Sequence, residues 1–110
     1  IEAIALAGFD FVIIDMEHGP FGLGHVREGL ITARSCELWA VVRVPSTEPS
    51  VIGAVLDAGA DGVLVPRVDS AEAARAVVAV RLYICSSEPS TAMGPICVEA
   101  KSTRPTLLQK

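Results

Sequence analysis

The sequence is poor in aromatic side chains and has no excess of positive charge. Aromatic residues make up only 5% of the 110-residue chain, and acidic residues outnumber basic ones, so the net charge is −4. Basic residues do not alternate with aromatic ones, as they do on many surfaces that bind nucleic acid. The composition therefore predicts that neither nucleic acid nor an anionic membrane surface is a partner of this chain.

Long apolar runs and paired cysteines are absent as well. No apolar run approaches the roughly 18 residues that a membrane-spanning helix needs, and no charged-then-apolar leader is visible. The three cysteines, Cys36, Cys85 and Cys97, are odd in number and lack the spacing of a zinc site. They predict neither a disulfide framework nor a zinc site, and this favours a cytoplasmic location.

What the sequence does contain is a repeated aliphatic pattern. Ala-Gly-Phe-Asp-Phe-Val-Ile-Ile at residues 7–14 recurs as Ala-Gly-Ala-Asp-Gly-Val-Leu-Val at residues 58–65. Each copy is typical of a helix end, a glycine cap, an aspartate in a turn and a buried strand. A third apolar run, residues 38–43, lies between the two copies, and Trp39 within it is expected in the core.

The segments that connect these apolar runs have helical periodicity, so strands and helices are predicted to alternate. The expected strands are residues 9–15, 38–43 and 61–66, and the expected helices are residues 22–36, 48–58 and 70–81. Alternation at this spacing indicates an α/β fold with parallel strands and right-handed crossovers. We predict a partial (β/α)8 TIM barrel of about three consecutive βα units, since eight units need about 250 residues.

The pattern dissolves after the third unit. Residues 82–110 are rich in turn-forming residues, and only residues 96–98 could form a very short strand. We therefore divide the chain into a barrel part, residues 1–81, and an irregular tail, residues 82–110. The start at Ile1 rather than at a methionine predicts that the chain is a fragment of a longer protein.

Polar side chains follow the first predicted strand abruptly. Asp15, Glu17 and His18 lie within four residues, and active sites of parallel α/β folds lie beyond the carboxyl ends of the strands. A carboxylate beside an imidazole stabilises the charged ring, as a general base near neutral pH requires. His18 is therefore the first candidate catalytic residue and Asp15 its partner, the alternative being a solvent-facing loop histidine. For Glu17, a hydrogen bond to a neighbouring loop is at least as well supported as catalysis.

Arg43 ends the second predicted strand in the same way. A cation at a barrel mouth needs an anionic partner, which either a substrate carboxylate or a protein carboxylate supplies. Substrate binding by Arg43 and an internal salt bridge to Asp15 or Glu17 therefore both stay open, and they are compatible. Arg67, on the third predicted strand, either reaches the mouth or lies on the surface.

Four segments together resemble the HpcH/HpaI aldolase family over about residues 1–81. They are residues 7–20, which contain Asp-Met-Glu-His-Gly-Pro, residues 41–45 (Val-Val-Arg-Val-Pro), residues 56–66 and residues 70–75. This family consists of class II, metal-dependent pyruvate aldolases on a (β/α)8 barrel. The resemblance implies reversible aldol cleavage of 4-hydroxy-2-oxo acids, such as 2-keto-3-deoxy sugar acids, to pyruvate and an aldehyde.

The resemblance also implies roles for individual residues. His18 matches the family's catalytic base, which works through water and is paired with the aspartate that matches Asp15. Arg43 matches the arginine that holds the keto oxygen and the developing enolate charge. The family's divalent metal, Mg²⁺, Mn²⁺ or Co²⁺, acts as a Lewis acid, and its two carboxylate ligands belong to later strands that are absent from this chain. Family members are typically hexamers, which implies a homo-oligomer for the full-length form.

Three functional hypotheses follow. The first is a fragment of a carbon–carbon lyase that acts on a small 2-oxo acid and is inactive by itself. The second is a non-catalytic remnant module, and the third is another barrel enzyme of the phosphoenolpyruvate or 2-oxo acid group. The combination of Asp15, His18 and Arg43 favours the first hypothesis over the third, whereas the missing metal ligands keep the second open.

Overall fold

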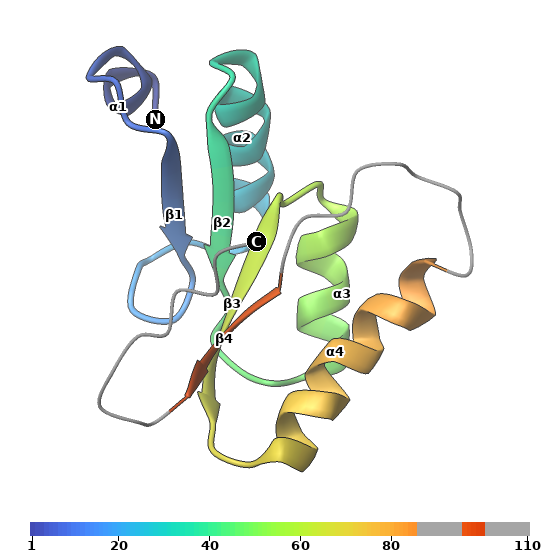
Figure 1. Cartoon of the computed structure of the whole chain (residues 1–110). Coiled ribbons are helices and arrows are strands. Elements are labelled where there is room, and N and C mark those ends of the chain that lie inside the picture. Colours follow the sequence, from blue (N-terminus) through green and yellow to red (C-terminus); the bar gives the residue numbers. More distant parts are fainter. Residues whose placement is uncertain (86–95, 101–110) are drawn as a thin grey trace.

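Four parallel strands form one sheet in the computed structural model, which describes residues 1–85 and 96–100, with side chains for residues 1–80 (Figure 1). The strands are hydrogen-bonded in the order β1-β2-β3-β4, so each strand lies beside the next one in the chain. In chain order the elements are α1 (Glu2–Leu6), β1 (Phe11–Asp15), α2 (Leu23–Ser35), β2 (Trp39–Arg43), α3 (Pro49–Asp57), β3 (Gly62–Val68), α4 (Ala71–Cys85) and β4 (Ile96–Ala100).

The three predicted βα units are all present, and their limits differ from the prediction mainly at the carboxyl end. β3 continues to Val68 and α4 continues to Cys85. Residues 96–98, which the sequence allowed as a very short strand, lie in β4, and this strand continues to Ala100 and pairs in parallel with β3. The open edge of β3 offers unpaired backbone groups that a fourth strand satisfies. The rest of the predicted tail, residues 86–95 and 101–110, lies outside the described residues.

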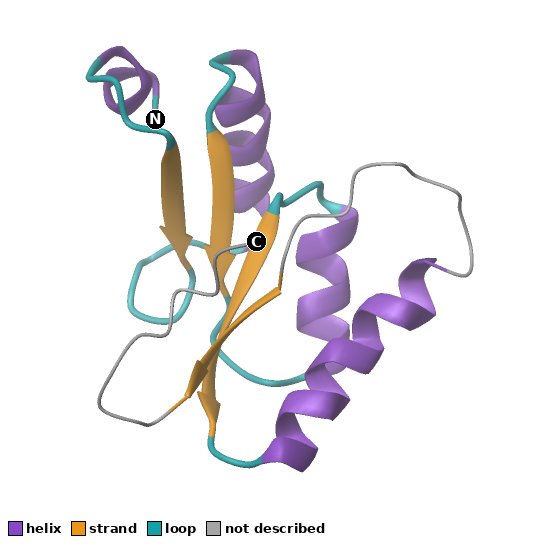
Figure 2. Cartoon of the chain, viewed as in Figure 1, coloured by secondary structure: helices purple, strands orange, loops and turns teal. Residues whose placement is uncertain are grey.

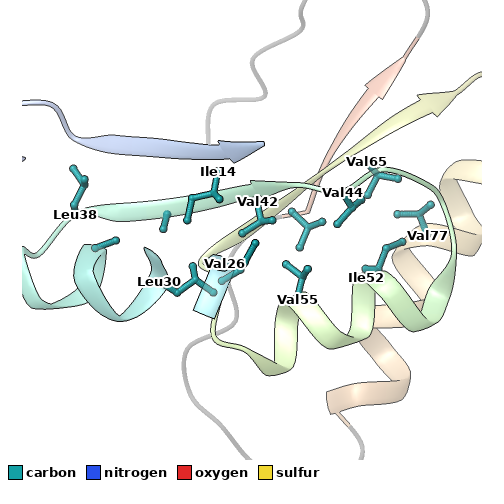
Figure 3. Close-up of a cluster of buried hydrophobic side chains, with 14 of the residues drawn as sticks. Ile14, Val26, Leu30, Leu38, Val42, Val44, Ile52, Val55, Val65 and Val77 are labelled. Atoms are coloured by element: carbon teal, nitrogen blue, oxygen red, sulfur yellow. The ribbon is translucent and has the colours of Figure 1, made fainter. Parts of the chain in front are cut away.

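The hydrophobic core lies between the sheet and the helices that connect the strands (Figure 3). Right-handed crossovers between successive neighbouring strands place the connecting helices on the same face of the sheet. Aliphatic side chains that alternate along the strands meet the apolar stripes of these helices. The buried hydrophobic residues are Ile14, Val26, Leu30, Ala33, Leu38, Ala40, Val42, Val44, Ile52, Val55, Ala60, Val63, Val65, Val68 and Val77.

The helices α2, α3 and α4 lie on one side of the sheet (Figure 2), and apolar side chains on its opposite face are exposed. Phe11 and Trp39 are paired in register on β1 and β2, and their side chains are 56% and 59% exposed. Ile13, the next residue on this face of β1, is 48% exposed. The prediction that Trp39 lies in the core is therefore wrong, because its side chain points away from the helices. Within the described ranges, no helix has the length and apolarity to cross a membrane.

Candidate active site at the carboxyl rim of the sheet

The carboxyl ends of β1 and β2 bring two of the candidate residues, Asp15 and Arg43, together. Asp15 and Arg43 are the last residues of their strands and are direct partners in the parallel register. The ladder continues one residue further, where the Met16 amide donates to the Arg43 carbonyl at 2.9 Å. The Asp15 Oδ2 atom lies 3.6 Å from Arg43 Nη1. Both side chains therefore occupy the same rim of the sheet, as expected from the strand order.

Asp15 also shapes the turn that follows β1. Its Oδ1 atom accepts hydrogen bonds from the amides of Glu17, at 2.8 Å, and His18, at 3.1 Å. The hydrogen bond from the His18 amide is the largest cause that lowers the pKa of Asp15, and the Glu17 amide and the Arg43 charge act in the same direction against partial desolvation. Asp15 is therefore an ionised carboxylate at neutral pH, held by the backbone that it organises.

Glycine is required where this turn closes. A side-chain Cβ on Gly19 would collide with the backbone oxygen of Asp15 and would lie 3.0 Å from the Phe21 ring. The chain after His18 therefore passes too close to the end of β1 for any larger residue. This close approach keeps His18 beside the strand ends.

Glu17 is the common partner of the basic groups at the rim. Its side chain is only 14% exposed, and its Oε2 atom lies 2.8 Å from Arg43 Nε and 3.5 Å from His18 Nδ1. Its Oε1 atom lies 3.7 Å from Arg67 Nη2. The contact with Arg43 is an ion pair rather than an aligned hydrogen bond. From the sequence, Glu17 is expected either to form a hydrogen bond to a neighbouring loop or to take part in catalysis. Its contacts with three basic side chains are not predicted, and its position two residues after Asp15 is the only sequence feature that points to them.

The His18 side chain is accessible, with 65% of its surface exposed. The carboxylate beside its ring belongs to Glu17, whereas Asp15 contacts the backbone amide of His18. The pairing of Asp15 with the imidazole, which the family resemblance implies, is thus not the contact seen here. The ring can still meet a small molecule or a water at the rim, with the Glu17 carboxylate beside Nδ1.

Arg67 reaches the same rim, where its Nη2 atom lies near Glu17. The sequence alone did not decide between this position and one on the surface. Arg67 is a non-glycine residue with a φ of 58°, an uncommon left-handed conformation, and the pairing of β3 with β4 shifts register between Val65 and Val68. Its Nη2 atom donates to the Pro45 carbonyl at 2.7 Å. Sequence alone gives no signal for this conformation beyond the place of Arg67 near the end of a predicted strand.

The described residues do not fit a divalent metal ion. Within the part of the chain that the structure describes, no group of three histidine, cysteine, aspartate or glutamate residues is arranged to hold one. The carboxylates of Asp15 and Glu17 face guanidinium groups and backbone amides, which compete with a cation for the same oxygen atoms.

Comparisons with known proteins agree with this fold. A family model described as HpcH/HpaI aldolase/citrate lyase matches residues 1–101. The chain is 49% identical over 79 residues to a hydroxypyruvate/pyruvate aldolase of Paraburkholderia phytofirmans, covering 69% of this chain and 30% of that protein. It is 46% identical over 85 residues to a 4-hydroxy-2-oxovalerate aldolase of Rhodococcus jostii, covering 74% of this chain and 32% of that protein.

A solved structure shows the same arrangement of strands and helices. A HpcH/HpaI aldolase/citrate lyase family protein from Burkholderia cenocepacia is similar with a TM-score of 0.68 and 37% sequence identity, over 72% of this chain and 32% of that one. The chain thus spans about a third of the length of the relatives it matches. The residues that the family model matches include the first three βα units and β4, and the chain belongs to the HpcH/HpaI aldolase/citrate lyase family.

Proposed function

We propose that the chain forms the first βα units of a (β/α)8 barrel enzyme that cleaves 4-hydroxy-2-oxo acids to pyruvate and an aldehyde. The observation that carries this proposal is the convergence of Asp15, Glu17, His18 and Arg43 at one rim of the sheet. The names of the two relatives, which specify pyruvate and a 4-hydroxy-2-oxo acid, support the same chemistry. Because the chain spans about a third of these relatives, the proposal concerns the protein of which it is a part.

Arg43 is proposed to hold the 2-oxo acid and to stabilise the enolate. When the bond between C3 and C4 breaks, its electron pair moves toward C3 and the C2 oxygen becomes negatively charged. A guanidinium fixed beside that oxygen stabilises the charge as it develops, and one such donor contributes about 10²- to 10³-fold in rate. The carboxylates of Asp15 and Glu17 hold the side chain in place, and its 25% exposure leaves it within reach of a small ligand.

His18 is proposed to act as the general base. Its imidazole takes the proton of the C4 hydroxyl through a water, so that C4 becomes the aldehyde carbon while the C3–C4 bond breaks. The proton then returns to C3 of the enolate and gives pyruvate, which balances the reaction. Glu17, at 3.5 Å from Nδ1, stabilises the imidazolium that exists between these steps. Asp15 acts as a positioning residue through the His18 amide and Arg43.

Enzymes of the aldolase/citrate lyase type generally depend on a divalent metal. Since the described residues do not fit one, we expect its carboxylate ligands on parts of the barrel beyond them, with Mg²⁺, Mn²⁺ or Co²⁺ as the ion. We also expect a homo-oligomer in the cytoplasm, on the basis of the family resemblance and of three cysteines whose number and spacing indicate neither a disulfide framework nor a zinc site.

The full-length polypeptide that contains this chain provides the test. Pyruvate release from 4-hydroxy-2-oxopentanoate, coupled to NADH oxidation by lactate dehydrogenase, is expected to fall about 10²- to 10⁴-fold for His18→Ala. His25→Ala is the matched control, because His25 is the only other histidine and lies exposed on α2. Full activity of His18→Ala, or no pyruvate release by the wild type with any of the three metals, would contradict the proposal.

The 110-residue chain by itself is expected to release no pyruvate, because it supplies a sheet open on one face and no metal site among its described residues. Pyruvate release by this chain alone would show that the remaining barrel is dispensable. If the full-length protein also fails to release pyruvate, the hypothesis of a non-catalytic module replaces the one proposed here.

A further inference from the structure

Arg67 is held at the rim by an unusual backbone conformation. With a φ of 58° at the register shift of β3, its side chain is aimed differently from that of a regular strand residue. Non-glycine residues in this region persist only where the surrounding structure enforces them, and they cluster at ligand-binding sites. Here the hydrogen bond from Nη2 to the Pro45 carbonyl fixes the side chain across the loop after β2.

Arg67 and Arg43 lie on either side of one carboxylate. Arg43 Nε is 2.8 Å from Oε2 of Glu17, and Arg67 Nη2 is 3.7 Å from Oε1 of the same group. The two guanidinium groups are therefore separated by little more than a carboxylate. A small molecule that contacts Arg43 lies within reach of Arg67.

The two arginines differ in depth. The Arg43 side chain is 25% exposed, whereas the Arg67 side chain is 62% exposed, so Arg43 is the inner cation and Arg67 the outer one. If the oxo acid end of the substrate contacts Arg43, as proposed above, the rest of the substrate extends outward past Arg67.

Carboxylate groups lie farther from the guanidinium group of Arg67 than from that of Arg43. Arg43 has two carboxylates, at 2.8 Å and 3.6 Å. Among the described residues, the hydrogen-bond partner of Arg67 is a neutral carbonyl, and its carboxylate neighbour lies beyond hydrogen-bond distance at 3.7 Å. A guanidinium in such a place binds carboxylate or phosphate through paired N–H groups.

We propose that Arg67 is a specificity-determining residue that binds a negatively charged group at the aldehyde end of the substrate. This inference rests on the proposed aldolase function and narrows its substrate class to 4-hydroxy-2-oxo acids with a second anionic group. In the direction of synthesis, the preferred acceptor is an aldehyde that bears a carboxylate or a phosphate.

The test compares two aldehydes of equal carbon number with the full-length protein. Aldol addition of pyruvate to succinic semialdehyde, which ends in a carboxylate, is measured beside addition to butanal, which ends in a methyl group. For Arg67→Met, kcat/KM with succinic semialdehyde is expected to fall about 10- to 100-fold, mainly through KM, because one charge-assisted contact is lost. The value for butanal is expected to change less than about 3-fold, and Arg67→Lys is expected to recover part of the loss, since it restores the charge without the paired donors.

Arg75→Met is the matched control, because Arg75 is exposed on α4 and its loss removes the same charge from the molecule. It is expected to leave both reactions unchanged. Glyceraldehyde 3-phosphate as a third acceptor distinguishes the two anions: a larger effect of Arg67→Met on this aldehyde identifies phosphate, and a larger effect on succinic semialdehyde identifies carboxylate.

A separate measurement distinguishes a failure of the proposed aldolase function from a failure of the proposed role of Arg67. Deuterium incorporation into the pyruvate methyl group by the wild type needs no aldehyde and tests enolate formation alone. If the wild type neither exchanges these protons nor adds pyruvate to any aldehyde, the proposed function fails and the role of Arg67 fails with it. If exchange occurs but Arg67→Met affects both aldehydes equally, or neither, only the role of Arg67 is overturned.

Discussion

At the scale of single residues, Glu17 links the groups that the proposed reaction uses. Its carboxylate lies within ion-pair distance of Arg43, His18 and Arg67, and its side chain is 14% exposed. The pair of Glu17 with Arg43, in which both side chains are mostly buried, is screened less by solvent than an exposed ion pair. A change of charge at Glu17 therefore alters the position of several site groups at once.

Glu17→Gln removes this charge and keeps the side-chain volume. We expect kcat/KM for pyruvate release by the full-length protein to fall about 10- to 100-fold, since a misplacement of about 1 Å in a site costs about 10²-fold. Glu28→Gln is the control, because Glu28 is exposed on α2. Equal activities of the two variants would show that the carboxylate of Glu17 does not organise the site.

Asp15 makes the free energy of unfolding of the protein depend on pH. Its pKa in the native state lies below the ordinary value, chiefly because the His18 amide donates to it. Since the native pKa is lowered, the ionised carboxylate stabilises the fold above the unfolded value of about 3.9, and this stabilisation is lost as the pH falls through the native pKa. The difference in free energy of unfolding between the wild type and Asp15→Asn is therefore expected to be larger at about pH 6 than at about pH 3.

Urea unfolding of the full-length protein at several pH values measures this difference. Asp57→Asn, at an exposed position on α3, serves as the comparison. A gap between wild type and Asp15→Asn that stays constant from neutral to acid pH would mean that the hydrogen bonds to Asp15 do not favour its charged form.

At the scale of elements, the repeated Ala-Gly-x-Asp pattern places an aspartate at equivalent positions before β1 and β3. Gly8 and Gly59 both have positive φ, 82° and 95°, so each ends a helix in the conformation that glycine favours. Asp10 accepts the Trp39 amide through its backbone oxygen, and Asp61 accepts the Ala40 amide through Oδ2 at 2.8 Å. The start of β2 is therefore tied to both neighbouring strands.

Asp61→Ala is expected to lower the free energy of unfolding by about 1–3 kcal/mol, because the amide of the buried Ala40 loses its acceptor. Asp61→Asn keeps an acceptor oxygen and is expected to cost less. Asp57→Ala, at an exposed position, controls for the loss of an acidic side chain. If Asp61→Ala and Asp57→Ala unfold at the same urea concentration, the hydrogen bond to Ala40 contributes no net stability.

The sequence predicted the elements well because their signals are local. Apolar runs, helical periodicity and glycine caps are properties of short segments, and the parallel topology then places Asp15 and Arg43 at one rim without further information. Arg67 could not be predicted, because its positive φ accompanies a register shift against β4, more than 25 residues away. Trp39 was placed wrongly because alternation shows which residues share a face but not which face is covered.

At the scale of the whole molecule, the uncovered face of the sheet is the most consequential feature. Phe11, Ile13 and Trp39 are about half exposed, and they lie side by side on β1 and β2. Contiguous apolar patches of this kind mark interaction surfaces or association sites. In a closed barrel this face would point inward, so the proposed function implies that other segments of the protein cover it.

The 110-residue chain alone is therefore expected to self-associate through this face. Trp39 is the only tryptophan and reports on its own burial, so its emission should shift to shorter wavelength as the chain concentration rises. Phe11→Lys places a charge directly opposite Trp39 in the register and is expected to weaken association at least about 10-fold, since burial of an unpaired charge is costly. Ile31→Lys, at a 71% exposed position on α2, adds the same charge elsewhere. A concentration series by sedimentation velocity distinguishes the cases: a chain that stays monomeric throughout, or equal weakening by both variants, would mean that this face does not drive association.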